Sequence, residues 1–400
     1  MKNLFNNDPI WTEREFSHPS RIIRLGSLFS GIGAIEHALK RLNIKTVIQF
    51  ASDIDINCKK SYFANYDISE EKWCSDVHEL NVKPYRYQVD LLVGGAPCQA
   101  FSLVGKRRGF ADTRGTLFRE FARIVKECKP KVFIFENVRG ILNHDNGVTW
   151  DVIRRTFEED LKYHIFCQVL NSKNYGIPQN RERLFCIGFR KKTDFVFPEP
   201  IKLEYKMYDF LLDTFDSSYF LNDKGVKFVT SHKNREKRYT QINGDIALCQ
   251  KRNQEFNWHG DFVYHPLAQG EEAYDEFIFD VSEVEEKYFL SEKVKKYVLS
   301  SGTKNFRTST ETDLDIARPL LHSMHKMHRA GVDNYVTNKG RIRKLTPREC
   351  LRLMGFKDWF KIVVSDTSMY QQAGNSIVVD VLIAILKQLD ITKYGVDEDK

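Results

Sequence analysis

The stretch IIRLGSLFSGIGAIEHALKRL, from Ile22 to Leu42, decides the fold class of this chain. Its first eight residues are mostly apolar, which is typical of a buried strand, and a turn containing Gly31 and Gly33 then leads into a helical pattern. Further apolar runs lie at 46–51, 89–93 and 131–138. Helical segments separate these runs, and one of them, residues 117–128, is stopped by Pro130. This alternation predicts an α/β fold with a mixed, mostly parallel sheet that has helices on both faces.

Composition limits the class of protein further. The chain has 400 residues, 42% of them hydrophobic, which is enough for two domains or for one large domain with an insertion. No run of eighteen apolar residues and no apolar segment at the N-terminus is present, so we expect neither a membrane span nor a secretory signal. The eight cysteines are scattered without a C-x-x-C pair, which argues against a zinc ribbon and a disulfide framework and favours a reducing cytosol. A net charge of +7 is compatible with a polyanionic partner.

The alternating pattern weakens in the middle of the chain. We expect a first domain over residues 1–198, a smaller domain over 199–338, and a return segment over 339–400 whose last helix completes the first domain. In the return segment, Thr346 and Glu349 predict a capping box, with Gly355 closing that helix. The apolar stretch NSIVVDVLIAILKQL (375–389) predicts one final helix.

Ligands of open parallel sheets bind beyond the carboxyl ends of the strands, where this chain has several marked turns. In the first turn, Gly31 and Gly33 would let the backbone approach a ligand closely. Asp53 follows 22 residues after Gly31, the spacing at which a carboxylate accepts hydrogen bonds from ribose hydroxyls, and Asp76 could take an adenine amino group. The third glycine of the dinucleotide fingerprint is absent, because Glu36 stands there, so a plain tight turn is the alternative.

Cys98 lies in a second turn, between Pro97 and Gln99. Most cysteines are small buried hydrophobic residues, but a core residue is poorly placed in such a turn. A thiolate is intrinsically a strong nucleophile, and the nearby Arg107 and Arg108 would attract an anionic substrate.

Glu136 ends the apolar run VFIFE, where a carboxylate is costly unless it has a partner. Two interpretations stay open at this point. A structural role would pair Glu136 with an arginine, whereas a catalytic role would have it protonated and donating to a substrate nitrogen. Arg181 and Arg183 are candidate partners on either interpretation.

Six segments in order resemble the motifs of the C5-cytosine DNA methyltransferases, which use S-adenosylmethionine. They are FSGIGAIE (29–36), GGAPCQAFS (94–102), FENVRG (135–140), QNRERLF (179–185), RKLTPRECLRLMGF (343–356) and QQAGNSIVV (371–379). The resemblance covers almost the whole chain. It implies a Rossmann-like class I methyltransferase fold with a target-recognition domain over the middle region.

The resemblance also implies a role for each motif residue. Cys98 would be the nucleophile at cytosine C6, with Glu136, Arg181 and Arg183 around the base, while Gln99 and Ser102 would hold the backbone near the cysteine. The cofactor residues would be Phe29, Ser30, Gly31, Ile32, Gly33, Asp53, Ile54, Asp76, Val77, Pro97, Asn375 and Ser376. No metal is required, and the partner would be duplex DNA with one cytosine flipped out. We expect a cytoplasmic monomer from a bacterial restriction-modification system, with a companion endonuclease.

Three other functions would require different sequence features. A tRNA cytosine methyltransferase of the same fold would carry a Cys-Phe-Thr tripeptide, which this sequence lacks. An inactive DNA-binding homologue would not need Cys98 and Glu136, and a nicotinamide-dependent dehydrogenase would have no use for GGAPCQAFS. His322, His325 and His328 recur at intervals of three, so a metal site is conceivable, but DNA-facing or plain surface histidines are the preferred interpretation.

Overall fold

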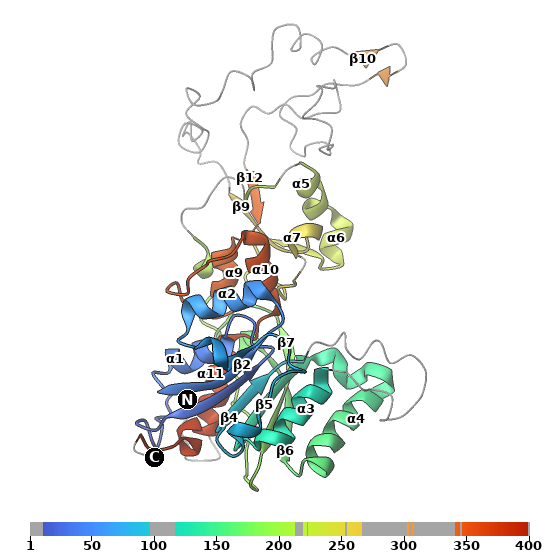
Figure 1. Cartoon of the computed structure of the whole chain (residues 1–400). Helices are drawn as coiled ribbons and strands as arrows, with labels where there is room; N and C mark the ends of the chain where they lie inside the picture. Colours follow the sequence, from blue (N-terminus) through green and yellow to red (C-terminus); the bar gives the residue numbers. More distant parts are fainter. Residues whose placement is uncertain are drawn as a thin grey trace.

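A seven-stranded sheet forms the centre of the molecule, in the order β3-β2-β1-β4-β5-β7-β6 (Figure 1). The computed structural model describes residues 11–96, 117–212, 219–221, 223–252, 254–265, 302–303, 306–307, 341–344 and 346–398. The strands are β1 (Ile23–Leu28), β2 (Thr46–Ser52), β3 (Trp73–Cys74), β4 (Leu91–Gly94), β5 (Val132–Val138), β6 (His164–Asn171) and β7 (Glu182–Phe189).

The sheet is mixed and mostly parallel, as the sequence predicts. β3, β2, β1, β4 and β5 pair in parallel, whereas β7 pairs antiparallel with both β5 and β6. The sequence pattern identified β1, β2, β4 and β5, but it assigned neither the two-residue edge strand β3 nor the β6–β7 pair. The carboxyl ends of the parallel strands lie at one edge, which is where ligands bind in such sheets.

The described helices cover both faces of this sheet or lie near a smaller sheet (Figure 1). They are α1 (Ala34–Arg41), α2 (Ile56–Asn65), α3 (Leu117–Cys128), α4 (Val148–Arg155), α5 (Asp223–Thr230), α6 (His232–Glu236), α7 (Gln254–Asn257), α9 (Pro347–Leu353), α10 (Asp366–Asn375) and α11 (Val379–Leu389). In Figure 1, α3 and α4 lie on one side of the sheet, and α1 and α11 lie on the other, whereas α5, α6 and α7 lie near the smaller sheet.

Alternate residues of the central strands pack into two separate cores. Along β5, Val132 and Ile134 join the core beneath α1 and α11, whereas Phe133 and Phe135 join the core beneath α3 and α4. Side chains of a strand point alternately to opposite faces, so a strand covered on both faces is apolar throughout. This is the physical reason why the run at 131–138 is almost continuously apolar.

The predicted final helix is confirmed over residues 379–389, but it begins later than residue 375, where we expected its start. α10 ends at Asn375, Ser376 has extended backbone angles, and α11 begins at Val379. The side chain of Arg181 accounts for the break, because it donates to the carbonyl oxygens of Gly374 and Ser376. The capping box of Thr346 and Glu349 at the start of α9 is confirmed.

One helical stretch of the described residues, Asp366–Leu389, has the length and apolar character of a membrane span. However, 72% of its most apolar window is buried inside the protein. It comprises α10 and α11, and α11 packs against α1 in the core. We therefore regard it as a core element.

A smaller sheet lies beyond α9 and α10 from the main one (Figure 1). Its order is β12-β9-β8, with β8 at Thr240–Ile242, β9 at Gly260–His265 and β12 at Arg341–Lys344. A two-stranded pair, β10 (Gly302–Thr303) and β11 (Phe306–Arg307), is also described. β12 joins the smaller sheet just before α9 returns the chain to the main domain.

Candidate active site

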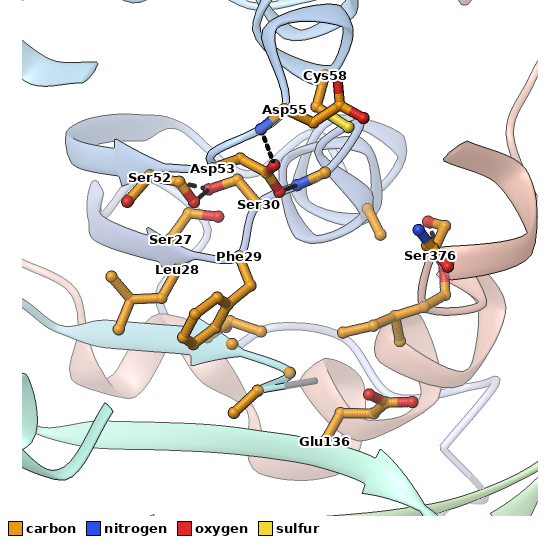
Figure 2. Close-up of a pocket in the computed structure, with 18 of the residues that line it drawn as sticks. Ser27, Leu28, Phe29, Ser30, Ser52, Asp53, Asp55, Cys58, Glu136 and Ser376 are labelled. Atoms are coloured by element: carbon orange, nitrogen blue, oxygen red, sulfur yellow. Dashed lines mark hydrogen bonds between the residues drawn. The ribbon is translucent and has the colours of Figure 1, made fainter. Parts of the chain in front are cut away.

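A cavity of about 650 Å³ opens at the carboxyl ends of β1, β2, β4 and β5 (Figure 2). Of the residues predicted for the cofactor, its wall contains Phe29, Ser30, Gly31, Asp53, Ile54, Asp76, Val77, Asn375 and Ser376. Of the residues predicted for the base, it contains Glu136, Arg181 and Arg183. The parallel sheet therefore brings both predicted sets to one cavity.

The two glycines of the first turn have different roles. Both have positive φ angles, 53° for Gly31 and 77° for Gly33, which favour glycine. A Cβ on Gly31 would meet no atom within 4 Å, so its backbone faces the open cavity. A Cβ on Gly33 would lie 2.2 Å from the ring of Tyr66. Gly33 therefore permits packing against α2, and neither it nor the buried Ile32 belongs to the cavity wall.

Asp53 fastens the turn after β1 to the turn after β2. One carboxylate oxygen accepts the backbone N–H of Gly31 at 2.8 Å, and the other accepts that of Asp55 at 2.9 Å (Figure 2). Burial raises the pKa of Asp53, and these two amide bonds oppose that rise. A carboxylate has about four acceptor positions, so Asp53 retains the capacity to accept further hydrogen bonds from a ligand.

The rim beside Asp53 is polar on one side and apolar on the other. The Asp76 carboxylate accepts the backbone N–H of His78 at 2.9 Å and contacts the His78 ring at 2.7 Å. These bonds hold the pKa of Asp76 below its ordinary value. Ile54, in contrast, is an aliphatic side chain that is 82% exposed. An apolar residue held open at a cavity edge can cover the flat face of a ligand ring.

Glu136 lies at the other end of the cavity, on β5. The Nε of Arg183 is 3.1 Å from a Glu136 carboxylate oxygen. Burial raises the pKa of Glu136, whereas the charges of Arg183 and Arg181 lower it. Glu136 therefore has the arginine partner that a structural role predicts and the cavity position that a catalytic role predicts.

The turn after β4 touches this carboxylate. A Cβ on Gly95 would lie only 2.7 Å from a Glu136 carboxylate oxygen, so no larger residue fits there without moving Glu136. Asn137, next to Glu136, donates from its side chain to the carbonyl of Ala96 at 2.9 Å. β5 thus fixes the backbone that leads toward Cys98.

Arg181 was also a candidate partner of Glu136, but its hydrogen bonds go to other groups. It is 3% exposed and donates to the carbonyl oxygens of Gln250 at 2.9 Å, Gly374 at 3.0 Å and Ser376 at 2.7 Å. Burial, together with the charge of Arg183, lowers its pKa to about 10. Arg181 therefore joins three segments that are distant in sequence.

Four predicted site residues, Pro97, Cys98, Gln99 and Ser102, lie outside the described residues, as do His322, His325 and His328. Their roles stay predictions. Ala96 and Leu117, which flank residues 97–116, both belong to the cavity wall. In the part of the chain that the structure describes, no group of three or more His, Cys, Asp or Glu side chains could hold a metal ion.

Sequence reasoning missed several residues of the cavity wall, among them Gly95, Cys58, Arg252 and Gln372. Gly95 and Gln372 lie inside motifs that were identified, so their proximity was a usable signal. Cys58 lies five residues after Asp53, on the next helix. Arg252 lies in the weakly periodic region, where the sequence offers no local signal.

The fold and the cavity define a class, that of the Rossmann-like α/β methyltransferases. Two solved structures share the architecture, each at low sequence identity. The S. pombe Dnmt2 methyltransferase has a TM-score of 0.58 at 20% identity, and the Entamoeba histolytica methyltransferase EhMeth has a TM-score of 0.60 at 16% identity. In both cases the match covers 92% of this chain and 98% of the other.

Sequence comparison identifies the family. The family model for C-5 cytosine-specific DNA methylases matches residues 23–390, so the chain belongs to that family and is a DNA (cytosine-5-)-methyltransferase. It is 31% identical to the orphan methyltransferase M.SPRI of Bacillus phage SPR, over 92% of this chain and 97% of the relative. It is 32% identical to the type II methyltransferase M.HpaII of Haemophilus parainfluenzae, over 92% and 89%.

Proposed function

We propose that this protein methylates C5 of a cytosine flipped out of a specific duplex DNA sequence, through a covalent bond between Cys98 and C6 of the base. The observation that supports this most directly is the shared cavity. It has the Gly31–Asp53 turn at one end and the Glu136–Arg183 pair at the other. A cofactor and a base bound at these two ends would meet inside it.

The cofactor end suits S-adenosylmethionine, which supplies an electrophilic methyl group on a charged sulfur. Phe29, Ser30 and Gly31 offer backbone at a wall that has room for a ligand, because a Cβ on Gly31 would meet nothing. Asp53 would accept from the ribose hydroxyls and Asp76 from the adenine amino group, with Ile54 and Val77 against the ring. The remaining cofactor residues would be Asn375 and Ser376 at the wall, Ile32 and Gly33 as support behind the turn, and Pro97, which lies outside the described residues.

The base end suits an activated cytosine. The Cys98 thiolate would form a bond to C6, and the electrons of the C5–C6 double bond would become available at C5. Glu136, whose burial favours the protonated acid, would donate to ring N3 as negative charge develops there, and Arg183 would donate to O2. After methylation, C5 loses its proton to a base, the double bond re-forms and the thiolate leaves. Arg181 supports this end by fixing the surrounding backbone.

The middle region, 199–338, would read the DNA sequence. Its helix α6 lies in the basic segment HKNREKR, whose lysines and arginines could contact phosphates. We also propose that the protein is cytoplasmic, nucleoid-associated and monomeric. The relatives include both type II and orphan methyltransferases. We propose that a companion endonuclease exists, and a restriction assay on extracts of the source cells would detect it.

A labelling experiment tests the proposed reaction. Purified protein is incubated with S-adenosylmethionine labelled on its methyl group and with either duplex DNA or tRNA. We expect label in DNA only, and digestion should recover it as 5-methylcytosine. Label in tRNA alone would favour the tRNA methyltransferase, and DNA binding without any transfer of label would favour an inactive homologue. Bisulfite sequencing of DNA from expressing cells then gives the target sequence.

A further inference from the structure

Several polar groups in the cavity wall, the Nε of Arg181 among them, have no hydrogen-bond partner among the residues that the structure describes, and two others stand out. One is the Nε2 amide of Gln372 on α10, which is buried, since the residue is 4% exposed. The other is the guanidinium of Arg252, an exposed residue for which no hydrogen bond or ion pair is found within the described ranges. A buried polar group without a partner costs about 1–3 kcal/mol, so the Gln372 amide calls for an acceptor.

Gln372 is held in a fixed orientation. Its Oε1 accepts a hydrogen bond from the Ser61 hydroxyl of α2 at 2.9 Å, which assigns the opposite side of the amide to the NH₂ group. The amide can therefore offer donors, but not its acceptor, to a ligand.

Arg252 lies at the same junction. A Cβ on Gly374, two residues after Gln372, would lie 2.6 Å from the Arg252 backbone nitrogen, so the end of α10 packs directly against residue 252. On the α2 side, Cys58 is one turn before Ser61. Burial and the charges of Asp53 and Asp55 raise the pKa of its thiol, and the charge of Arg252 opposes that rise. Arg252, Gln372 and the first turns of α2 thus meet at one part of the wall.

A carboxylate can bind at this point only beside a cation. Asp53 and Asp55 also line the cavity here, and they would repel a ligand carboxylate unless a cation offset them. The other two arginines of the wall are engaged, because Arg181 donates to three carbonyl oxygens and Arg183 pairs with Glu136. Arg252 is the remaining arginine of the described wall.

We propose that Arg252 and Gln372 bind the α-carboxylate of the cofactor's amino acid end, with the guanidinium and the amide NH₂ as donors. This assignment depends on the proposed function, because it presupposes a cofactor with a carboxylate. It gives the cofactor a contact from the segment that leads into α7 and β9. Cofactor binding would therefore hold this part of the recognition region against α10, beside the Gln250 carbonyl to which Arg181 donates.

Calorimetry with two ligands isolates the carboxylate. S-adenosylhomocysteine carries it, and the decarboxylated analogue S-adenosyl-3-thiopropylamine keeps the amine and lacks only the carboxylate. In Arg252→Gln we expect the affinity for S-adenosylhomocysteine to fall roughly tenfold, as for a lost hydrogen bond to a charged group. Affinity for the decarboxylated analogue should change less than twofold. Lys251→Gln, which removes the neighbouring cation outside the cavity wall, is the control and should leave both affinities unchanged.

Gln372→Glu is a second variant. It keeps the acceptor for Ser61 and replaces the amide NH₂ by an oxygen that repels a carboxylate. Its affinity for S-adenosylhomocysteine should therefore fall more than its affinity for the decarboxylated analogue. Equal loss of both ligands in Arg252→Gln, or no loss of either, overturns the subsite while the cofactor site stands. Loss of DNA binding alone would instead make Arg252 a phosphate contact. Failure of the wild type to bind either ligand would overturn the proposed function as well.

Discussion

Glu136 shows how closely a single side chain is fixed in this site. Arg183 holds one carboxylate oxygen from β7, and the backbone of Gly95 leaves no room for a Cβ beside the other. The position of the carboxylate is therefore set by two neighbouring strands and by a glycine. Placing a catalytic group to within a fraction of an ångström has a large effect on rate, since a misplacement of about 1 Å can cost roughly 100-fold.

Gly95→Ala tests this positioning. The new Cβ would lie 2.7 Å from the Glu136 carboxylate oxygen, and the flexible side chain would move aside. We expect kcat to fall roughly 10- to 100-fold, with little change in thermal stability, because no backbone has to shift. Gly140→Ala is the matched control, since a Cβ there meets nothing within 4 Å. A Gly95→Ala enzyme as fast as wild type would show that the position of Glu136 is not critical.

Residues at the ends of strands were predictable, and residues whose role depends on distant packing were not. Glu136 and Asp53 follow apolar runs, so their place at the sheet edge could be inferred from the sequence. The collision of Gly33 with Tyr66 and the position of Arg252 depend on contacts between segments far apart in the chain. Arg181 was predicted for the site, but its three carbonyl partners come from two regions that no local pattern connects to it.

Among the elements, the break between α10 and α11 has a tertiary cause. The apolar pattern after Ser376 correctly predicts a buried helix, and it cannot show that Arg181 takes the carbonyls of Gly374 and Ser376 out of the helical pattern. α9 illustrates the opposite case. Its capping box depends only on Thr346 and Glu349, which are three residues apart, and so the sequence alone predicted it.

His37 links α1 to the loop after α9, and it makes that contact sensitive to pH. Its Nε2 accepts the backbone N–H of Lys357 at 3.0 Å, and its ring stacks on Trp359 with centroids 4.1 Å apart. Burial, reinforced by the charges of Arg41, Lys40 and Lys357, lowers the pKa of His37 from 6.5 to about 3. The folded state therefore keeps the ring neutral where the unfolded chain would protonate it.

The sign of the effect follows from linkage. The contribution of His37 is complete above pH 6.5 and is lost as the pH falls from 6.5 toward 3, by at most about 1.4 kcal/mol per pH unit. In His37→Gln we expect a smaller difference between the free energies of unfolding at pH 7 and pH 5 than in wild type, measured by urea denaturation. His232→Gln, at a ring that is 88% exposed on α6, is the control. An unchanged pH dependence in His37→Gln would contradict the buried neutral state.

On the scale of the whole molecule, the chain builds the cavity by leaving the main sheet and returning to it. Wall residues come from the first strands, from β5 and β7, from Arg252 and from the end of α10. The sequence predicted the alternating first half and the returning C-terminal segment. It could not predict that β7 lies between β5 and β6, because strand order is fixed by contacts between distant residues. In the smaller sheet, β12 pairs antiparallel with β9 across a long separation in sequence.

Exchange of residues 200–338 for the matching segment of a relative tests whether this region reads the DNA sequence while the cavity carries out the methylation. We expect the chimera to methylate the relative's sequence while C5 of cytosine stays the reacting atom, because the cavity residues other than Arg252 lie outside the exchanged segment. Bisulfite sequencing gives the new target. The inserted segment must supply a strand that pairs with β12 in place of β9. Folding of the chimera is therefore checked first by circular dichroism and cofactor binding. A folded chimera that still modifies the original site would place sequence recognition elsewhere.

Covalent catalysis by Cys98 can be tested by trapping the protein on DNA that carries 5-fluorocytosine in the target. Fluorine at C5 permits methyl transfer but blocks elimination, because it cannot leave as a cation. We expect a protein–DNA complex that survives denaturing electrophoresis, that requires S-adenosylmethionine, and that is absent in Cys98→Ala. Glu136→Gln should form it roughly 100-fold more slowly, because an amide stabilises the developing charge less well. An enzyme that methylates ordinary DNA and never forms this complex would contradict covalent catalysis. A complex that persists in Cys98→Ala would show that another residue is the nucleophile.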